Sequence, residues 1–224
     1  MAIQLQGNAG TVAEVDGTTF RAVRVTGRPL DYGALGFYRV SAVSGTMAAA
    51  LAANAEIFQF RWPDATRLAV VTRVAISAGA NVAATAAAIL SVRLTAARSW
   101  TVAGSGGTRL TMTGNNQKLR TSMGTSLVND IGISTTAGLT AGTKTLDAQD
   151  LGGLSYGVGT GAITTALNLN LFPLTELLNI DASTDHPLVL AQNEGFVIRS
   201  GIINPAAMTW AFTVNVSWAE VAAY

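Results

Sequence analysis

An alternation of large apolar residues with small, mostly polar ones near residue 210 constrains the fold more than any other feature of this sequence. The even positions carry large apolar side chains: Met208, Trp210, Phe212, Val214, Val216 and Trp218. Between them, positions 209, 213, 215 and 217 carry small polar residues. A period of two is typical of a β-strand with one face on a core and the other on water. At about 3.3 Å of rise per residue, the strand predicted over 208–220 is long enough to cross a small β-sandwich.

Further alternating runs predict strands at residues 56–62, 68–77, 89–95 and 167–171, the last ended by Pro173. Shorter β pieces, broken up by Gly and Thr after residue 108, are predicted at 38–44, 109–113, 118–123 and 127–134. The run 186–199 predicts a short strand, a turn at Asn193-Glu194-Gly195, and a second strand with Phe196 and Ile198 on one face. This run is also a candidate partner for the strand over 208–220. Residues 44–54 predict a short helix or a tucked loop, and the glycine-rich residues 135–165 predict a loop region.

Eight to ten short strands with little helix predict an all-β protein. Long connections at the ends of two sheets favour a jelly-roll-type antiparallel β-sandwich with an N-terminal extension over an immunoglobulin-like fold. Residues 46–224 would form the sandwich domain. The alternation places thirteen side chains in one core: Phe58, Phe60, Trp62, Val70, Val74, Val92, Leu94, Leu169, Phe196, Ile198, Phe212, Val214 and Val216.

Residues 1–45 differ from the rest and predict an N-terminal arm or hairpin segment. Asp16-Gly17 is a hairpin turn signal between two short apolar runs. The segment has too few large apolar residues for a core of its own and too many for a solvated tail, so something must cover it. Either it pairs with the main sheet, or it reaches onto a neighbouring molecule as an attachment arm.

Charged residues make up 12% of the 224 residues, about half the usual share. Such a poorly solvating surface favours coverage by other subunits, so we expect a homo-oligomer, a trimer first and a dimer second. A compact soluble β domain is the alternative. Cysteine is absent, which excludes disulfides and thiolate metal sites. Lys118 and Lys144 are the two lysines among 14 basic residues, and no basic run suggests a nucleic-acid partner.

A membrane location is not expected. The uncharged stretch Val74 to Val92 contains Gly79 and Asn81 and is better explained by two strands and a loop than by a transmembrane helix. The N-terminal residues have neither the basic start nor the apolar centre of a signal peptide, so secretion by that route is not expected.

Residues that could carry chemistry form no reactive pattern. His186, beside Asp185, is the sole histidine and reads as a turn residue, because no Gly-x-Ser-x-Gly motif accompanies it. The pairs Asp147/Asp150 and Asp181/Asp185 lack the spacing of a calcium loop, although calcium in a loop stays open. Gly157–Gly161 lacks the lysine and helix of a phosphate-binding loop, so a flexible loop is expected. The glutamates, at positions 14, 56, 176, 194 and 220, share no pattern for glycoside hydrolysis.

The four tryptophans could form a platform for sugar stacking. Trp62, Trp210 and Trp218, however, fall on the apolar faces of predicted strands, where a core role is expected. Trp100, next to a glycine-rich loop, stays open. The sequence therefore assigns no catalytic, cofactor-binding or metal-binding residue and no cofactor, and it favours a protein that is not an enzyme.

The runs 44–62, 187–199 and 214–220 resemble uncharacterised structural proteins of tailed bacteriophages, over about residues 38–221. The resemblance implies a jelly-roll virion protein made in the host cytoplasm. It suggests a capsid decoration or cement protein on the capsid surface, rather than the tail, with other virion proteins such as the major capsid protein as partners. A tail fibre or spike module that binds host-surface carbohydrate is the alternative, and a small glycan hydrolase is a weaker one.

Overall fold

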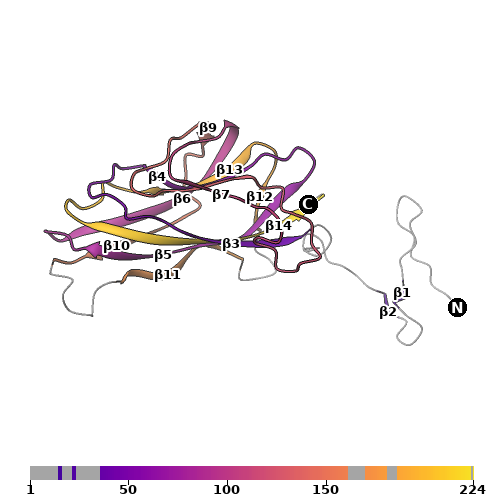
Figure 1. Cartoon of the computed structure of the whole chain (residues 1–224), viewed down its shortest axis with the longest axis horizontal. Coiled ribbons are helices and arrows are strands. Elements are labelled where there is room, and N and C mark those ends of the chain that lie inside the picture. The colour runs from indigo at the N-terminus through magenta and orange to yellow at the C-terminus, as the bar shows by residue number, and fades with distance from the viewer. Residues whose placement is uncertain (1–14, 17–21, 24–35, 161–169, 181–185, 223) are drawn as a thin grey trace. The chain divides into compact units, whose positions relative to one another are not determined.

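Strand β14 (Thr209–Val221) lies inside a sheet, between β3 (Phe37–Val43) and β5 (Leu68–Val82) (Figure 1). The computed structural model describes residues 15–16, 22–23, 36–160, 170–180, 186–222 and 224. The strand predicted over 208–220 is confirmed, and its apolar face is buried. Its predicted partner is wrong, because the run 186–199 pairs with other strands and β14 bonds to β3 and β5 along its length.

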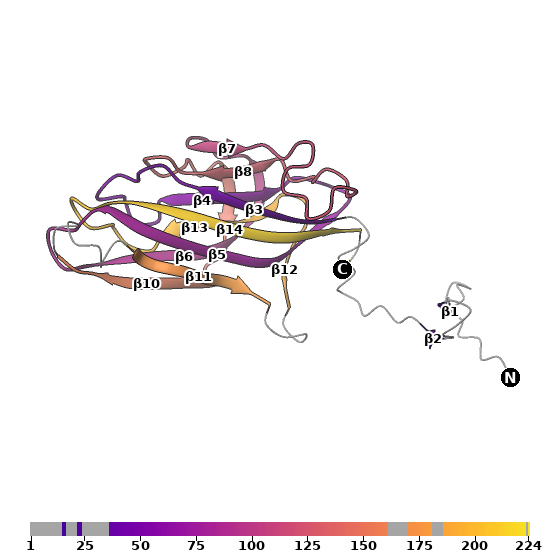
Figure 2. The ribbon, with the colours of Figure 1, turned by 60° about the horizontal axis from the view of Figure 1, so that its bottom comes forward.

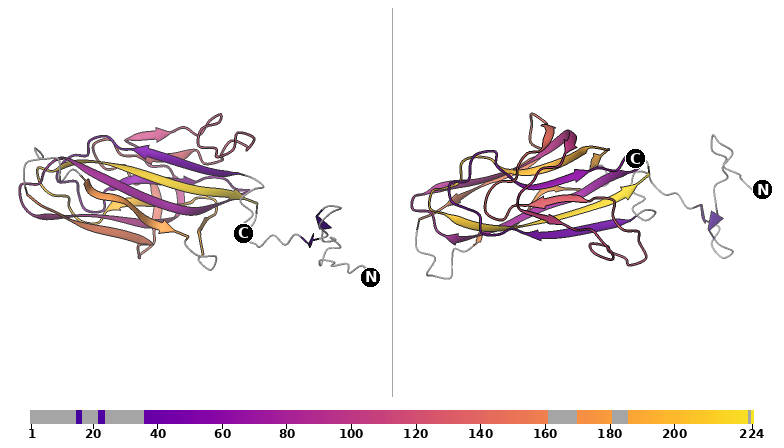
Figure 3. Two further views of the ribbon diagram at one scale, coloured as in Figure 1. Left: turned by 90° about the horizontal axis from the view of Figure 1, so that it is seen from below. Right: turned by 45° about the horizontal axis from the view of Figure 1, so that its top comes forward.

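Eight strands pair in nested order, the first with the last, and all four pairs are antiparallel. They are β3 with β14, β4 (Glu56–Trp62) with β13 (Glu194–Ser200), β5 with β11 (Asn170–Asn179), and β6 (Ala88–Val102) with β10 (Gly152–Val158). The two resulting sheets run β11-β5-β14-β3, side by side in Figure 2, and β10-β6-β13-β4. Figure 3 shows both sheets from two further sides. This nesting is the jelly-roll topology, which confirms the predicted fold class.

Four short strands extend the two sheets. Strands β7 (Thr108–Leu110) and β8 (Asp130–Ile133) continue the second sheet beyond β4, β9 (Thr143–Leu146) pairs with β6, and β12 (Leu188–Leu190) pairs with β5. The turn before β13 therefore links the two sheets. Strands β9 and β10 contradict the loop predicted over 135–165, since β6 is long enough to pair with both despite their glycines.

Two other local predictions are settled by hydrogen bonding. Residues 44–54 form a loop and not a helix. The strand predicted over 118–123 is wrong, because this stretch makes a single bridge, from Lys118 to Tyr38, and otherwise turns.

The main core lies between the two sheets and contains eleven of the thirteen predicted core residues. Leu169 lies outside the described residues. Val70 packs instead with Ala219 and Val221 in a small cluster outside the main core. The reason is a β-bulge: Ser217 pairs with Arg73 and Trp218 with Val71, so Thr72 is an extra residue that reverses the inward and outward positions of β5.

Strand β11 continues through Pro173 to Asn179, which contradicts the predicted end at Pro173. The strand lies at the edge of its sheet, and its pairing with β5 shifts between Phe172 and Thr175. An edge position at a register shift tolerates the missing N–H group of proline.

In the N-terminal segment, β1 (Val15–Asp16) and β2 (Ala22–Val23) form an antiparallel pair. The predicted turn at Asp16-Gly17 is described only at Asp16, which belongs to β1 and pairs with Ala22, while Gly17 lies outside the described residues. The chain divides into compact units 1–31 and 32–224. The predicted boundary at residue 45 lies later in the chain than this division after residue 31. The difference arises because β3 pairs with β14 and so belongs to the sandwich.

Candidate functional site

One end of the sandwich has loops without a single charged residue. We call it the uncharged loop end, and its described loops are residues 44–55, 83–87 and 201–208. They connect β3 to β4, β5 to β6, and β13 to β14, at the left in Figure 1. The register places them together, since Val43 and Val82 pair with positions 213 and 209 at the same end of β14. The sequence of the β10–β11 connection, 159–169, also lacks charge.

Aliphatic side chains are exposed at this end. Val43 at the end of β3 and Ile203 in the β13–β14 loop are 67% and 65% exposed. Val82, Ile89 and Ile202, at neighbouring strand ends and in the same loop, are also exposed. Charged groups are excluded from the centres of protein interfaces, so an end that combines exposed aliphatic groups with a lack of charge has the composition of a contact surface.

The loops of this end are joined by backbone hydrogen bonds. The amide of Met47 donates to Trp210 O at 2.7 Å, that of Ala50 to Pro205 O at 3.2 Å, and that of Asn204 to Leu51 O at 2.9 Å. Ala50 and Ala207 have φ angles of 54° and 63°, in the left-handed region that alanine rarely adopts. The bonds between the loops therefore hold a backbone conformation that costs free energy, as is common at functional surfaces.

The outer face of the β10-β6-β13-β4 sheet carries a second polar feature, covered by the β6–β10 connection, residues 103–151. Asp130 of β8 forms salt bridges with Arg61 at 3.3 Å and with Arg109 at 3.0 Å. Lys144 of β9 lies 2.8 Å from Glu56 of β4, with its side chain 1% exposed. These contacts tie the connection to the sheet beneath it, because a buried charge requires a charged or hydrogen-bonding partner.

Lys144 also lies over an aromatic ring. Its Nζ atom is 4.2 Å from the ring centroid of Trp100, which is fully buried with Ala97 and Val197. Burial lowers the pKa of Lys144, while the hydrogen bond to Glu56 partly opposes that shift. The position of Trp100 does not fit a sugar-stacking platform. Trp62, Trp210 and Trp218 lie in the main core, as predicted.

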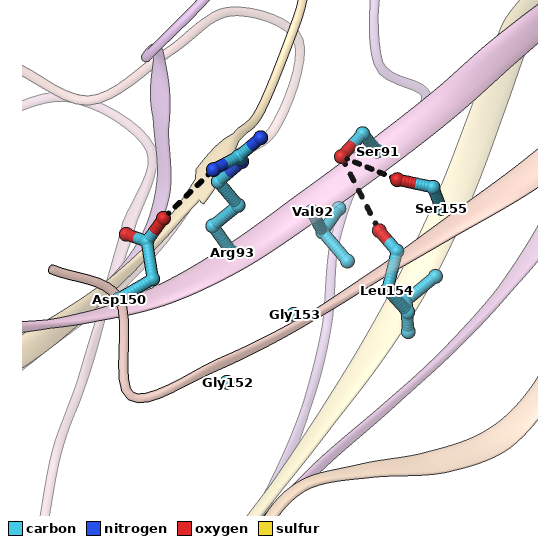
Figure 4. A pocket seen from close by; sticks show the side chains of 8 residues that line it. All are labelled: Ser91, Val92, Arg93, Asp150, Gly152, Gly153, Leu154 and Ser155. Atoms are coloured by element: carbon cyan, nitrogen blue, oxygen red, sulfur yellow. Dashed lines mark hydrogen bonds and ion pairs between the residues drawn. The ribbon is translucent and has the colours of Figure 1, made fainter.

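A shallow hollow of about 370 Å³ lies on the outer face of β6 and β10 (Figure 4). It is lined by Ser91, Val92, Arg93, Asp150, Gly152, Gly153, Leu154 and Ser155. Asp150 accepts hydrogen bonds from Thr95 at 2.6 Å and from Arg93 and Arg199 at 3.0 Å each. Burial alone would raise the pKa of Asp150, but these three hydrogen bonds outweigh it and lower the pKa.

The residues singled out in the sequence do not form a reactive group. His186 is exposed, with Nδ1 2.7 Å from Pro187 O, and its ring contacts Tyr224. Asp147 and Asp150 diverge, since Asp147 pairs with Arg98 at 3.5 Å. Asp181 and Asp185 lie outside the described residues. The flexible loop predicted at Gly157–Gly161 is wrong at its start, because Gly157 belongs to β10, while Gly161 is not described.

The described glutamates serve separate contacts. Glu56 bonds Lys144, Glu176 bonds Arg73 at 2.7 Å, and Glu194 bonds Arg98 at 2.7 Å. Glu14 lies outside the described part. Glu220 is buried and accepts hydrogen bonds from Ser126 Oγ at 2.5 Å and from the Leu127 amide. Burial raises the pKa of Glu220 against the effect of these bonds.

Within the described part of the chain, no three His, Asp or Glu residues gather as they would to hold a metal ion. Within the same residues, no helix has the length and apolar character needed to cross a membrane. The stretch from Val74 to Val92 forms the end of β5, a loop and the start of β6, as predicted.

The sequence patterns missed both the uncharged loop end and the contacts of Lys144. Loop composition gave a usable signal, because the loop at 44–55 and its counterparts lack charge while 63–67 and 103–151 do not. The signal at Gln59 was misleading. Its place between Phe58 and Phe60 suggested a solvated face, yet Gln59 is fully buried beneath the β6–β10 connection.

The fold defines an all-β protein of the jelly-roll class. Comparison of the chain with protein-family models, curated proteins and solved structures finds no significant match.

Proposed function

We propose that this chain is a non-enzymatic structural protein of a tailed-bacteriophage particle, a decoration or cement protein that binds the head shell. The uncharged loop end carries the proposal. Exposed Val43 and Ile203 in loops without charge suit a lasting contact with another virion protein better than a solvated surface. The jelly-roll topology and the resemblance of the sequence to phage structural proteins support the same class.

The proposed partners are the major capsid protein and further copies of this chain. In this arrangement the uncharged loop end contacts the shell, and the N-terminal segment acts as an attachment arm. The division of the chain after Asp31 supports a separate role for that segment. A homo-oligomer, a trimer before a dimer, agrees with the low charge of the sequence. Sedimentation of the isolated protein measures that state, and a stable monomer at high concentration would count against self-association.

A charge placed on the uncharged loop end tests the main proposal. Ile203→Asp should abolish binding to particles that lack the protein, since a carboxylate buried at an apolar interface is costly. Leu119→Asp is the matched control: Leu119 is 55% exposed and lies near Phe37, at the opposite end of β3. Both variants should keep the β circular dichroism spectrum. Equal occupancy of the two variants on particles would overturn the role of this end.

Deletion of residues 1–31 tests the arm. The remaining chain keeps every strand of the sandwich, so it should fold and lose occupancy on the particle. If the shortened protein bound particles at wild-type occupancy, the N-terminal segment would not be an attachment arm. The role of the uncharged loop end would still be tested separately by Ile203→Asp.

A tail fibre or spike module that binds carbohydrate is the second candidate. The hollow on β6 and β10 favours it, because hydroxyls of Ser91 and Ser155 and the half-exposed guanidinium of Arg93 suit sugar hydroxyls. Labelled protein located on intact particles separates the candidates: the head supports a decoration protein, and the tail together with binding to a glycan array supports the alternative.

A further inference from the structure

Two side-chain nitrogens contact the same carboxylate oxygen beneath the β6–β10 connection. Glu56 Oε2 lies 2.8 Å from Lys144 Nζ and 2.6 Å from Gln59 Nε2. All three side chains are buried: Gln59 has no exposed surface, and the side chains of Lys144 and Glu56 are 1% and 7% exposed. An amine, a carboxamide and a carboxylate are thus held together away from water.

We propose that Lys144 and Gln59 join in an intramolecular amide cross-link, with Glu56 as the catalytic residue that transfers the proton. The inference concerns this chain alone and does not depend on the proposed function.

The reaction is an amide exchange that needs no further reactant. Lys144 Nζ gives a proton to Glu56 Oε2 and attacks Gln59 Cδ, so that a new C–N bond forms and the carbonyl becomes a tetrahedral oxyanion. Nζ then loses its second proton as Gln59 Nε2 gains one through Glu56, and the Cδ–Nε2 bond breaks. The products are a secondary amide between residues 59 and 144 and one molecule of ammonia, with no change in oxidation state.

The electrophile is held and polarised by groups on the connection. Arg109 Nη2 donates to Gln59 Oε1 at 3.3 Å, which places a positive charge where the oxyanion develops. Gln59 Nε2 also donates to Thr140 O at 2.8 Å, which fixes the orientation of the amide. The backbone of Gly104 packs against the same group, since a Cβ atom there would come within 2.5 Å of Gln59 Oε1.

The pKa of Lys144 is lowered, which eases the loss of the proton that precedes attack. Burial lowers its pKa, and the charge of Arg109 lowers it further, whereas Glu56 and Asp130 act in the opposite direction. In other enzymes, lysine becomes a nucleophile when burial or a nearby positive charge favours its neutral form. The ring of Trp100 excludes water on one side of Nζ.

The cross-link would fasten the β6–β10 connection to β4. It closes a loop between residues 59 and 144, so it would restrict the unfolded chain in the way that a disulfide does in other proteins. This chain has no cysteine and so cannot form a disulfide.

Intact mass spectrometry of the full-length folded protein, denatured just before injection, tests the proposal. The expected mass is that of the sequence less one ammonia, and proteolysis should release a branched peptide joining Gln59 to Lys144. The variants Lys144→Met, Gln59→Leu and Glu56→Ala should each show the mass of their own sequence, without the loss of ammonia. Lys118→Met is the matched control, because Lys118 is the other lysine and bonds Asn115 on the surface, so this variant should still lose ammonia.

The wild-type protein gives the decisive result even where a variant fails to fold. A full, unshifted mass after prolonged incubation of the folded protein would overturn the cross-link and leave an ordinary ion pair. An ammonia loss that persists in folded Lys144→Met, or that maps to other residues, would overturn it as well.

Discussion

Gly195 of β13 lies directly against Trp100: a Cβ atom on Gly195 would come within 2.9 Å of Trp100 Cε3 and within 2.2 Å of Phe60 O. Gly195→Ala should therefore destabilise the protein by about 1–3 kcal/mol, because neither the buried ring nor the backbone oxygen can move away freely. Urea denaturation measures the loss. Gly157→Ala is the control, since a Cβ atom at Gly157 meets nothing within 4 Å, and equal effects of the two substitutions would contradict the packing.

Phe212 tests the placement of β14. Its ring is buried in the main core and lies 5.2 Å from Trp210, so Phe212→Ala should cost about 3–5 kcal/mol of unfolding free energy. Val43→Ala, at a side chain that is 67% exposed, should change stability by less than about 0.5 kcal/mol. A loss below about 1 kcal/mol for Phe212→Ala would show that β14 is misplaced.

Asp150 should make the protein sensitive to acid. Its pKa in the folded protein lies below the ordinary value of 3.8, so the folded state binds its proton less readily than the unfolded chain. The stability that Asp150 contributes is present above pH 3.8 and is lost as the pH falls through the lower folded value. The stability difference between wild type and Asp150→Asn should shrink over that range, and a constant difference would contradict the assignment.

Glu220 should behave in the opposite way. Burial raises its pKa above 4.5, so the folded state binds the proton more readily than the unfolded chain. Its contribution is present below pH 4.5 and is lost as the pH rises through the higher folded value. Relative to Glu220→Gln, which stays neutral, wild type should gain stability as the pH is lowered from neutral. Chemical denaturation of both proteins across that range is the measurement, and a gain with rising pH would refute it.

Alternation of side chains carried most of the fold prediction. The runs at 56–62 and 208–218 are buried on one face over their full length, so a local pattern was enough to locate their strands and core residues. The prediction failed where pairing overrides the pattern. Thr72 is an extra residue only because of how β5 meets β14, and nothing in the local sequence reveals it. Strand β10 forms from a glycine-rich segment because β6 offers a long edge.

The candidate sites were less predictable than the fold. Gln59 and Glu56 are buried because a connection more than forty residues further along covers them, which strand periodicity does not encode. Tyr38 is similar: burial and the nearby Glu220 raise its pKa to about 12, yet the two residues are far apart in the sequence. Loop charge, in contrast, is a local property, and it becomes informative once topology shows which loops share an end.

The nested pairing of strands has a consequence for synthesis. Strand β14 lies between β3 and β5 but emerges from the ribosome after both. Until it arrives, those two strands have no neighbour on their inner edges, and the apolar face of the sheet stays open. Folding must therefore wait for contacts between residues as distant as Phe37 and Ala219, which is slow and leaves the nascent chain open to aggregation. A ribosome stalled before residue 209 should hold a chain that proteases still digest, and one stalled well beyond residue 221 should hold a resistant one.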